Sequence, residues 1–206
     1  MNAAKVKLVE YGAGNLPSVE RALRRLGVEA ERAGTPEVLV GSRIIILPGV
    51  GHFGALMRTL AERHLLAPLR AALAGGVPFL GICLGLQALY AASEEAPDQS
   101  GLGILAGAIR PLPNTAKLPH MGWNQLRQVR PSILLRDLPA DAFFYFAHSY
   151  AALDAGEAAV ALCDHGAPFV AALEQGNVMA VQFHPEKSGA AGARVLRNFL
   201  EFAHGV

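Results

Sequence analysis

Cys83 is the side chain of this sequence whose setting best suits covalent chemistry. It follows the apolar residues 77–82, and Gly81 and Gly85 lie two positions before and after it. A reactive residue on a sharp turn between a strand and a helix needs small neighbours at these two positions. Backbone N–H groups at the start of the helix would favour the thiolate, which is the form that attacks. The pattern predicts a nucleophile elbow, although on residue type alone Cys83 would be a small buried hydrophobe.

A cysteine nucleophile needs a base, and the tripeptide His184-Pro185-Glu186 offers one far along the chain. Pro185 biases His184 toward an extended conformation, in which residues two apart point to the same side. Glu186 could then hold the imidazole while His184 activates Cys83. Alone, the tripeptide would be a solvated loop, but with the elbow it predicts a triad. Cys163 lies in an apolar run without flanking glycines and is interpreted as structural.

Length and composition predict a single globular domain over residues 1–206, of which 52% are hydrophobic and 17% charged. A net charge of +1 leaves no excess to attract nucleic acid or an anionic membrane. Two cysteines without a Cys-x-x-Cys pair predict no disulfide scaffold, metal site or cofactor and fit a reducing, cytoplasmic setting. Residues 71–92 carry no charge, but their glycines and Pro78 would break a membrane helix.

The elements that must position these residues alternate in the first half of the chain. Buried strands are expected at residues 6–11, 28–32, 43–47 and 78–82. Helices are expected at residues 18–26, 56–73 with an interruption near Pro68, and 84–92. Continuous apolar strands between helices indicate a parallel sheet that is covered on both faces.

The second half is richer in strands and closes with an amphipathic helix. Strands are expected at residues 107–112, 143–150, 158–163, 169–173 and 178–183, and the helix at residues 190–203. The sequence therefore predicts an α/β fold with a mixed, centrally parallel open sheet and helices on both faces.

The two motifs, Gly-Ile-Cys-Leu-Gly at 81–85 and His-Pro-Glu at 184–186, resemble those of the triad-type, class I glutamine amidotransferases. The resemblance implies their flavodoxin-like fold and the hydrolysis of the side-chain amide of L-glutamine. By that resemblance, Cys83 forms a glutamyl thioester and releases ammonia, and water then releases glutamate.

A glycine-rich turn, Pro48-Gly49-Val50-Gly51, follows the strand expected at residues 43–47. Open α/β sheets bind ligands at the carboxyl ends of their strands, where glycines let the main chain approach the substrate. Gly49 is a predicted substrate contact. Backbone N–H groups of Val50 or Gly51, with that of Leu84, could donate to a developing oxyanion. Without Cys83, an ordinary turn would be the preferred interpretation.

Further predicted contacts surround the substrate. Gln87 lies one helical turn beyond the nucleophile, so its amide could reach the backbone end of glutamine. Glu95 resembles the carboxylate that binds the substrate ammonium in the family, and the adjacent Glu94 leaves this register open. Ser149 and Tyr150 match the segment whose backbone holds the α-carboxylate in relatives.

Four segments resemble a narrower branch of the family, the glutaminase subunits of imidazole glycerol phosphate synthase. They are Tyr-Gly-Ala-Gly-Asn-Leu at 11–16, Pro-Gly-Val-Gly-His-Phe-Gly at 48–54, Pro-His-Met-Gly-Trp-Asn at 119–124, and residues 182–188. The resemblance implies a heterodimer with a (βα)₈-barrel cyclase subunit that uses the ammonia in histidine biosynthesis. The length agrees, because the glutaminase fold uses up the 206 residues and leaves no room for a synthase domain.

The docking surface implied by this resemblance comprises Asn15, Met121, Trp123, Tyr145 and Lys187. Trp and Tyr are typical interface anchors, but Trp123 could equally be a core aromatic and Lys187 a solvated cation. Three alternative functions stay open. They are a glutaminase for another acceptor, a γ-glutamyl hydrolase or cysteine peptidase with the same triad, and an inactive scaffold.

Overall fold

The structure, a computed structural model, describes residues 5–154 and 156–205. The strands of its main sheet are β1 (Val6–Val9), β2 (Ala30–Ala33), β3 (Ile45–Gly49), β4 (Phe79–Cys83), β8 (Arg127–Gln128), β11 (Ala159–Asp164), β12 (Pro168–Gln175) and β13 (Val178–Val181). Their order is β2-β1-β3-β4-β13-β12-β11-β8. The pairs from β2 through β13 are parallel, and the remaining pairs are antiparallel. The predicted mixed, centrally parallel sheet is confirmed, and its parallel part has the flavodoxin-like order.

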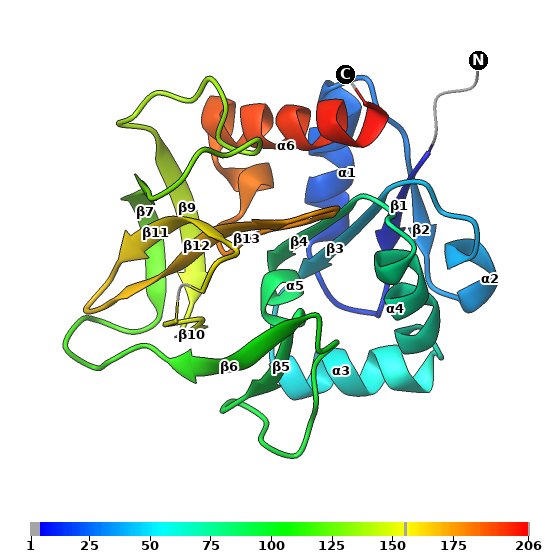
Figure 1. The fold of residues 1–206 in the computed structure, drawn as a ribbon, viewed down its shortest axis with the longest axis horizontal. Helices are drawn as coiled ribbons and strands as arrows, with labels where there is room; N and C mark the ends of the chain where they lie inside the picture. The colour runs from blue at the N-terminus through cyan, green and yellow to red at the C-terminus, as the bar shows by residue number, and fades with distance from the viewer. Residues whose placement is uncertain (1–4, 155, 206) are drawn as a thin grey trace.

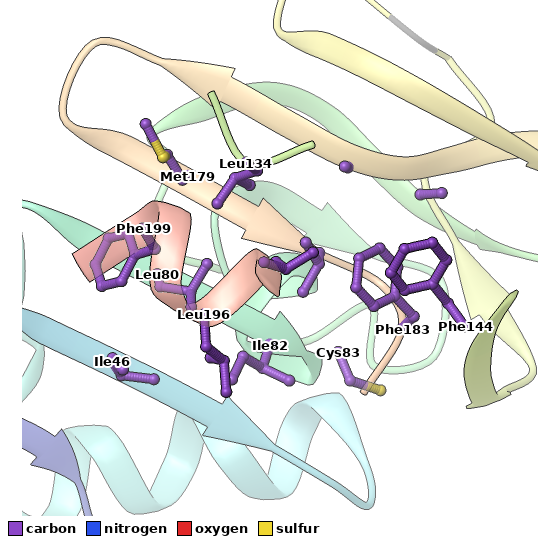
Figure 2. Close-up of a cluster of buried hydrophobic side chains, with 14 of the residues drawn as sticks. Ile46, Leu80, Ile82, Cys83, Leu134, Phe144, Met179, Phe183, Leu196 and Phe199 are labelled. Atoms are coloured by element: carbon purple, nitrogen blue, oxygen red, sulfur yellow. The ribbon is translucent and has the colours of Figure 1, made fainter. Parts of the chain in front are cut away.

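Helices cover both faces of this sheet (Figure 1). The longer ones are α1 (Leu16–Arg25), α3 (Phe53–Glu62), α4 (Leu66–Ala74) and α6 (Gly189–His204). Alternate strand residues divide between the two layers, because successive side chains of a strand point to opposite faces. Ile46 and Ile82 share a buried cluster with α1 and α6, whereas Ile45 and Phe79 share one with α3 and α4. Figure 2 shows Leu196 of α6 beside Ile82, with Cys83 at the edge of this cluster.

Two smaller sheets flank the main one. One contains β5 (Tyr90–Ser93), β6 (Leu105–Pro111) and β10 (Tyr150–Ala151), and the other pairs β7 (His120–Gln125) with β9 (Phe143–His148). The N–H of His184 donates to the carbonyl of Tyr145 over 2.8 Å, so β9 is tied to the segment that follows β13. The β7–β9 pair therefore has a fixed position beside the predicted catalytic histidine.

The helix expected at residues 84–92 is wrong in its extent. The helix α5 (Leu84–Gln87) is a single turn, and the chain then forms β5. All four residues of α5 are buried. A short apolar run that is buried on every side has no periodicity to separate helix from strand, so the boundary could not be read from the sequence.

The helix expected at residues 56–73 is two helices, and the break does not lie at Pro68. It lies around His64, which adopts a φ of 56° between α3 and α4. Pro68 is the third residue of α4, where its missing N–H would have no helical partner. The short helix α2 (Pro36–Leu39) and the strands β7 and β8 were not anticipated.

The uncharged residues 71–92 are divided among α4, β4, α5 and β5. Within residues 5–154 and 156–205, the structure contains no helix of the length and hydrophobicity needed to cross a membrane.

Candidate active site

Cys83 ends β4 with φ 54° and ψ −107°, a conformation that is rare for a residue with a side chain. Holding such a residue costs about 1–3 kcal/mol, which the surrounding structure must offset. The parallel pairing of β3 with β4 sets Gly49 opposite Cys83. The predicted strand-to-helix turn is present, and it lies at the carboxyl edge of the sheet.

Gly81 and Gly85 are required because α5 packs directly on the strand backbones. A Cβ on Gly85 would lie 1.9 Å from the carbonyl oxygen of Leu47, and one on Gly81 would lie 2.6 Å from the carbonyl oxygen of Gly85. Neither contact can be relieved by moving a flexible side chain. The two glycines therefore let the helix follow the nucleophile at once.

His184 and Glu186 form a buried pair. The His184 Nδ1 and Glu186 Oε1 atoms are 2.9 Å apart, and the two side chains are 2% and 1% exposed. His184 is extended, as expected before proline, and the 3₁₀ helix η1 (Pro185–Lys187) turns Glu186 toward the ring. Glu186 Oε2 is buried and has no hydrogen-bond partner among the described residues. The hydrogen bond of this carboxylate within the site is therefore the one to His184 Nδ1.

His184 and Cys83 line the same cavity. Burial lowers the pKa of His184, but hydrogen bonds to Cys83 and Glu186 outweigh it and raise this pKa to about 10. The imidazole of His184 is therefore protonated at neutral pH. The structure brings together all three residues of the predicted triad.

A cavity of about 350 Å³ opens over the Cys83 sulfur and the His184 ring. Its wall includes most of the predicted oxyanion and substrate residues: Val50, Gly51, Leu84, Gln87, Glu95, Ser149 and Tyr150. Gly49 is the exception. It is buried, and a Cβ there would lie 2.5 Å from that of Leu84, so its contact with substrate stays a prediction.

The two neighbouring glutamates, Glu94 and Glu95, lie in different environments. Glu95 lies on the cavity wall, and its Oε2 accepts a 2.7 Å hydrogen bond from the N–H of Phe53 at the start of α3. Glu94 is exposed and pairs with Arg110 at 3.4 Å. Of the two candidates for binding the substrate ammonium, only Glu95 faces the cavity.

The predicted oxyanion donor Val50 is engaged elsewhere in this conformation. Its N–H donates to the hydroxyl of Tyr11 over 3.1 Å. Burial, only partly offset by the hydrogen bond with Val50, raises the pKa of Tyr11 to about 12, so the phenol is protonated at neutral pH. Val50 would have to leave Tyr11 before it could serve an oxyanion. Gly51 and Leu84 lie beside it on the wall.

Three polar residues of the site were missed by the sequence analysis: Gln182, His148 and His120. The Nε2 of Gln182 is 3.5 Å from the Cys83 sulfur. The Nδ1 of His148 is 2.9 Å from the carbonyl oxygen of Tyr150, and its Nε2 is 3.1 Å from His120 Nδ1. A glutamine directly after the apolar strand β13 was the available signal for the first.

Four of the five predicted docking residues form a cluster beside the cavity: Met121, Trp123, Tyr145 and Lys187. Met121 is 65% and Trp123 55% exposed. The Trp123 and Tyr145 ring centroids are 6.0 Å apart, and Lys187 Nζ lies 5.4 Å from the Tyr145 ring. Met121 and Lys187 also line the cavity. Asn15 instead occupies the N-cap position of α1.

Cys163 has the properties of a structural cysteine. It is buried, and burial is the main cause that raises its pKa to about 12. Across the described ranges, no group of three or more His, Cys, Asp or Glu residues is arranged to hold a metal ion.

Comparison with known proteins defines the class to which this fold and site belong. The family model "Glutamine amidotransferase class-I" matches residues 7–202. A crystal structure described as a glutamine amidotransferase superposes with a TM-score of 0.77 at 25% identity, covering 97% of this chain and 99% of that one. PurLQS from Thermotoga maritima shares the fold, with a TM-score of 0.76, 21% identity and 96% and 98% coverage. The chain belongs to the class-I glutamine amidotransferase family and is an enzyme of that class.

More similar relatives narrow the assignment within this family. The imidazole glycerol phosphate synthase subunit HisH of Moorella thermoacetica is 44% identical over 95% of this chain and 94% of its own. The HisH subunit of Methanothermobacter thermautotrophicus is 45% identical over 95% of this chain and 98% of its own. Within the amidotransferases, the chain belongs with these HisH subunits.

Proposed function

We propose that this chain is the glutaminase subunit of an imidazole glycerol phosphate synthase and that Cys83, His184 and Glu186 hydrolyse glutamine. The observation that carries the proposal is the position of His184, which pairs with the Glu186 carboxylate and lines the same cavity as Cys83. Membership of the HisH branch supports the delivery of ammonia to imidazole glycerol phosphate synthesis. It counts against a glutaminase that serves another pathway.

The reaction divides into two steps. The Cys83 thiolate attacks the side-chain carbonyl carbon of glutamine, and the His184 imidazolium gives its proton to the leaving nitrogen as the C–N bond breaks. Ammonia leaves, and a glutamyl thioester remains. His184, now neutral, takes a proton from water as the water attacks the thioester. The C–S bond breaks, and glutamate is released. The thiolate–imidazolium pair is thereby restored.

Glutamine binding uses the opposite side of the cavity. The carboxylate of Glu95 is fixed by Phe53 and receives the α-ammonium group. The backbone at Ser149 and Tyr150 faces the α-carboxylate, and Gln87 lies between this segment and the nucleophile. The amide end of the substrate is thereby directed to Cys83.

The partner surface is the cluster of Met121, Trp123, Tyr145 and Lys187. Exposed apolar side chains of this size mark interaction sites, and two of the four residues also line the cavity mouth. A subunit docked there closes the site over the reaction. Ammonia that escaped to water would become mostly ammonium, which is not a nucleophile, so an enclosed route to the partner preserves it. The proposed partner is a (βα)₈-barrel cyclase subunit.

The test combines the chain with its cyclase subunit and follows product formation from glutamine or from ammonium salts. Cys83→Ala should reduce the glutamine-dependent reaction by at least about 10³-fold while synthesis from ammonium persists, because only the first reaction uses the thiolate. Glutamine hydrolysis by this variant would remove Cys83 as the nucleophile. Faster turnover of γ-glutamyl peptides than of glutamine would favour the hydrolase alternative.

The docking surface is tested by Trp123→Ala against Val40→Ala. Val40 is 73% exposed at the end of α2, far from β7 (Figure 1). Loss of an aromatic anchor should weaken association by about 30-fold, and the control should leave it unchanged. Equal affinities for the two variants would place the interface elsewhere.

A further inference from the structure

Gln182 lies against the nucleophile although it belongs to neither the triad nor the cavity wall. It follows β13, and its side chain is fully buried. Its Nε2 atom is 3.5 Å from the Cys83 sulfur, which is within hydrogen-bond range for a sulfur acceptor. A buried amide needs partners for both of its ends, so the direction in which it points has chemical consequences.

The surrounding hydrogen bonds fix that direction. The carbonyl oxygen of Tyr150 can only accept, so the Gln87 atom that lies 2.8 Å from it must be the donor Nε2. The same Nε2 lies 3.2 Å from Gln182 Oε1, which must therefore be the acceptor. With its oxygen turned to Gln87, the amide of Gln182 presents its N–H₂ group to Cys83.

His148 strengthens this orientation from the other side of Tyr150. Its Nδ1 lies 2.9 Å from the same carbonyl oxygen, and its Nε2 faces His120. Because the carbonyl accepts, His148 Nδ1 carries a proton and donates. The Tyr150 carbonyl oxygen thus accepts from two donors. Reversing the amide of Gln87 would set its oxygen against this carbonyl oxygen. The donor and the acceptor are therefore determined for each hydrogen bond of the series from His120 of β7 to the Cys83 sulfur.

We infer that Gln182 is a second stabiliser of the Cys83 thiolate, acting by a hydrogen bond from its Nε2 to the sulfur. The inference rests on the proposed role of Cys83 as the nucleophile. An N–H donor favours the ionised sulfur over the neutral thiol, because a charged acceptor forms the stronger bond. His184 must give its proton to the leaving group, whereas the amide of Gln182 does not titrate. Gln182 therefore holds the sulfur while the imidazole changes charge.

The inference is tested by the pH dependence of Cys83 alkylation. The full chain is treated with iodoacetamide, and modification at Cys83 is followed by peptide mass spectrometry so that Cys163 does not contribute. Gln182→Leu removes the donor, and Gln182→Glu replaces it by a carboxylate of the same shape. The midpoint of the alkylation profile should rise by about one pH unit in the leucine variant, a tenfold loss of rate below the midpoint. In the glutamate variant it should rise at least as far.

Kinetics of the complex with the cyclase subunit add a second measurement. Both variants should lose more in kcat for glutamine than they change in KM, because the bond is made to the nucleophile. Leu200→Ala, a destabilising change within α6, serves as the control and should leave the alkylation midpoint in place.

The outcomes distinguish a failure of the role inferred for Gln182 from a failure of the role proposed for Cys83. An unchanged midpoint in a folded Gln182→Leu or Gln182→Glu variant would show that Gln182 only packs against Cys83. If the leucine variant does not fold, the glutamate variant decides, because it conserves volume. Persistent glutaminase activity in Cys83→Ala would instead remove the nucleophile itself, whatever the Gln182 variants do.

Discussion

The backbone strain at Cys83 can be measured by comparing Cys83→Gly with Cys83→Ala. Both variants lack the sulfur, so the loss of its interactions with His184 and Gln182 cancels. They differ only in the Cβ atom, which at φ 54° and ψ −107° is the source of the strain. We expect the glycine variant to be the more stable of the two, which reverses the usual order.

The magnitude follows from opposing terms. Replacing alanine by glycine in regular structure costs about 0.5–1 kcal/mol of backbone entropy, and a buried methyl contributes up to about 0.8 kcal/mol more. Relief of the strained conformation returns about 1–3 kcal/mol. The net gain should be about 0.5–1 kcal/mol in favour of glycine. At Ala88, which is fully buried with φ −60° and ψ −20°, the strain is absent and glycine should cost about 1–1.5 kcal/mol.

The assay is urea unfolding of the two variants at position 83 together with wild type and Ala88→Gly, followed by circular dichroism. The effect of replacing alanine by glycine on the free energy of unfolding should differ between positions 83 and 88 by about 2 kcal/mol. This corresponds to about 4–8 °C in Tm for a chain of this size. A glycine penalty at position 83 as large as that at position 88 would refute the reasoning. The elbow would then be an unstrained conformation in this fold.

Three further predictions concern the surroundings of the site. Tyr11→Phe frees the N–H of Val50 and should raise the glutaminase rate of the isolated chain, by up to about 10²-fold if that donor limits oxyanion binding. Gly85→Ala places a Cβ 1.9 Å from the oxygen of Leu47 and should lower the free energy of unfolding by more than about 3 kcal/mol, measured in urea. Burial lowers the pKa of His148 to about 3, so its contribution to stability is complete above its ordinary pKa of 6.5 and is lost as the pH falls toward 3. His148→Gln should therefore remove about 2 kcal/mol of the acid-induced loss between neutral pH and pH 5, by urea titrations at both values.

Each of these predictions has a contradicting result. An unchanged or lower basal rate in Tyr11→Phe would mean that Val50 is not a limiting donor. A Gly85→Ala variant as stable as wild type would show that α5 can move away from β3. The His148 comparison uses the difference between variant and wild type because protonation of His184 has the opposite sign: its pKa is raised, so its contribution is present at acidic pH and lost toward pH 10. A variant with the same acid sensitivity as wild type would exclude His148 as the cause.

The sequence was sufficient for the elements that have one physical solution. Apolar β-branched strands between helices require a sheet covered on both faces, and β3 and β4 lie where they were expected. Two glycines around Cys83 have few uses other than a tight strand-to-helix turn. His184 is extended before Pro185 as expected, and the 3₁₀ turn that begins at this proline brings Glu186 to the ring. In these cases local chemistry and the global fold require the same structure.

The remaining features depend on contacts that sequence spacing does not contain. The end of α5 at Gln87 is set by packing against other strands. The apolar run that follows contains no residue pattern that signals this helix end. Gln182 acquires its role only because β13 pairs with β4, which sets it beside Cys83. Which of Glu94 and Glu95 faces the cavity is likewise decided by the N–H of Phe53. Each is a tertiary contact between segments far apart in sequence.

These contacts make the three ionisable groups of the site a single electrostatic unit. Glu186 has one oxygen paired with His184 and one buried without a partner among the described residues, so the imidazole is the group that stabilises this carboxylate. The protonated imidazole in turn depends on both Cys83 and Glu186, because burial alone would lower the pKa of His184. Loss of the sulfur should therefore lower the pKa of His184 and weaken its pairing with Glu186. The proposed bond from Gln182 acts on the sulfur, so a neutral donor at that position also affects His184 and, through it, Glu186.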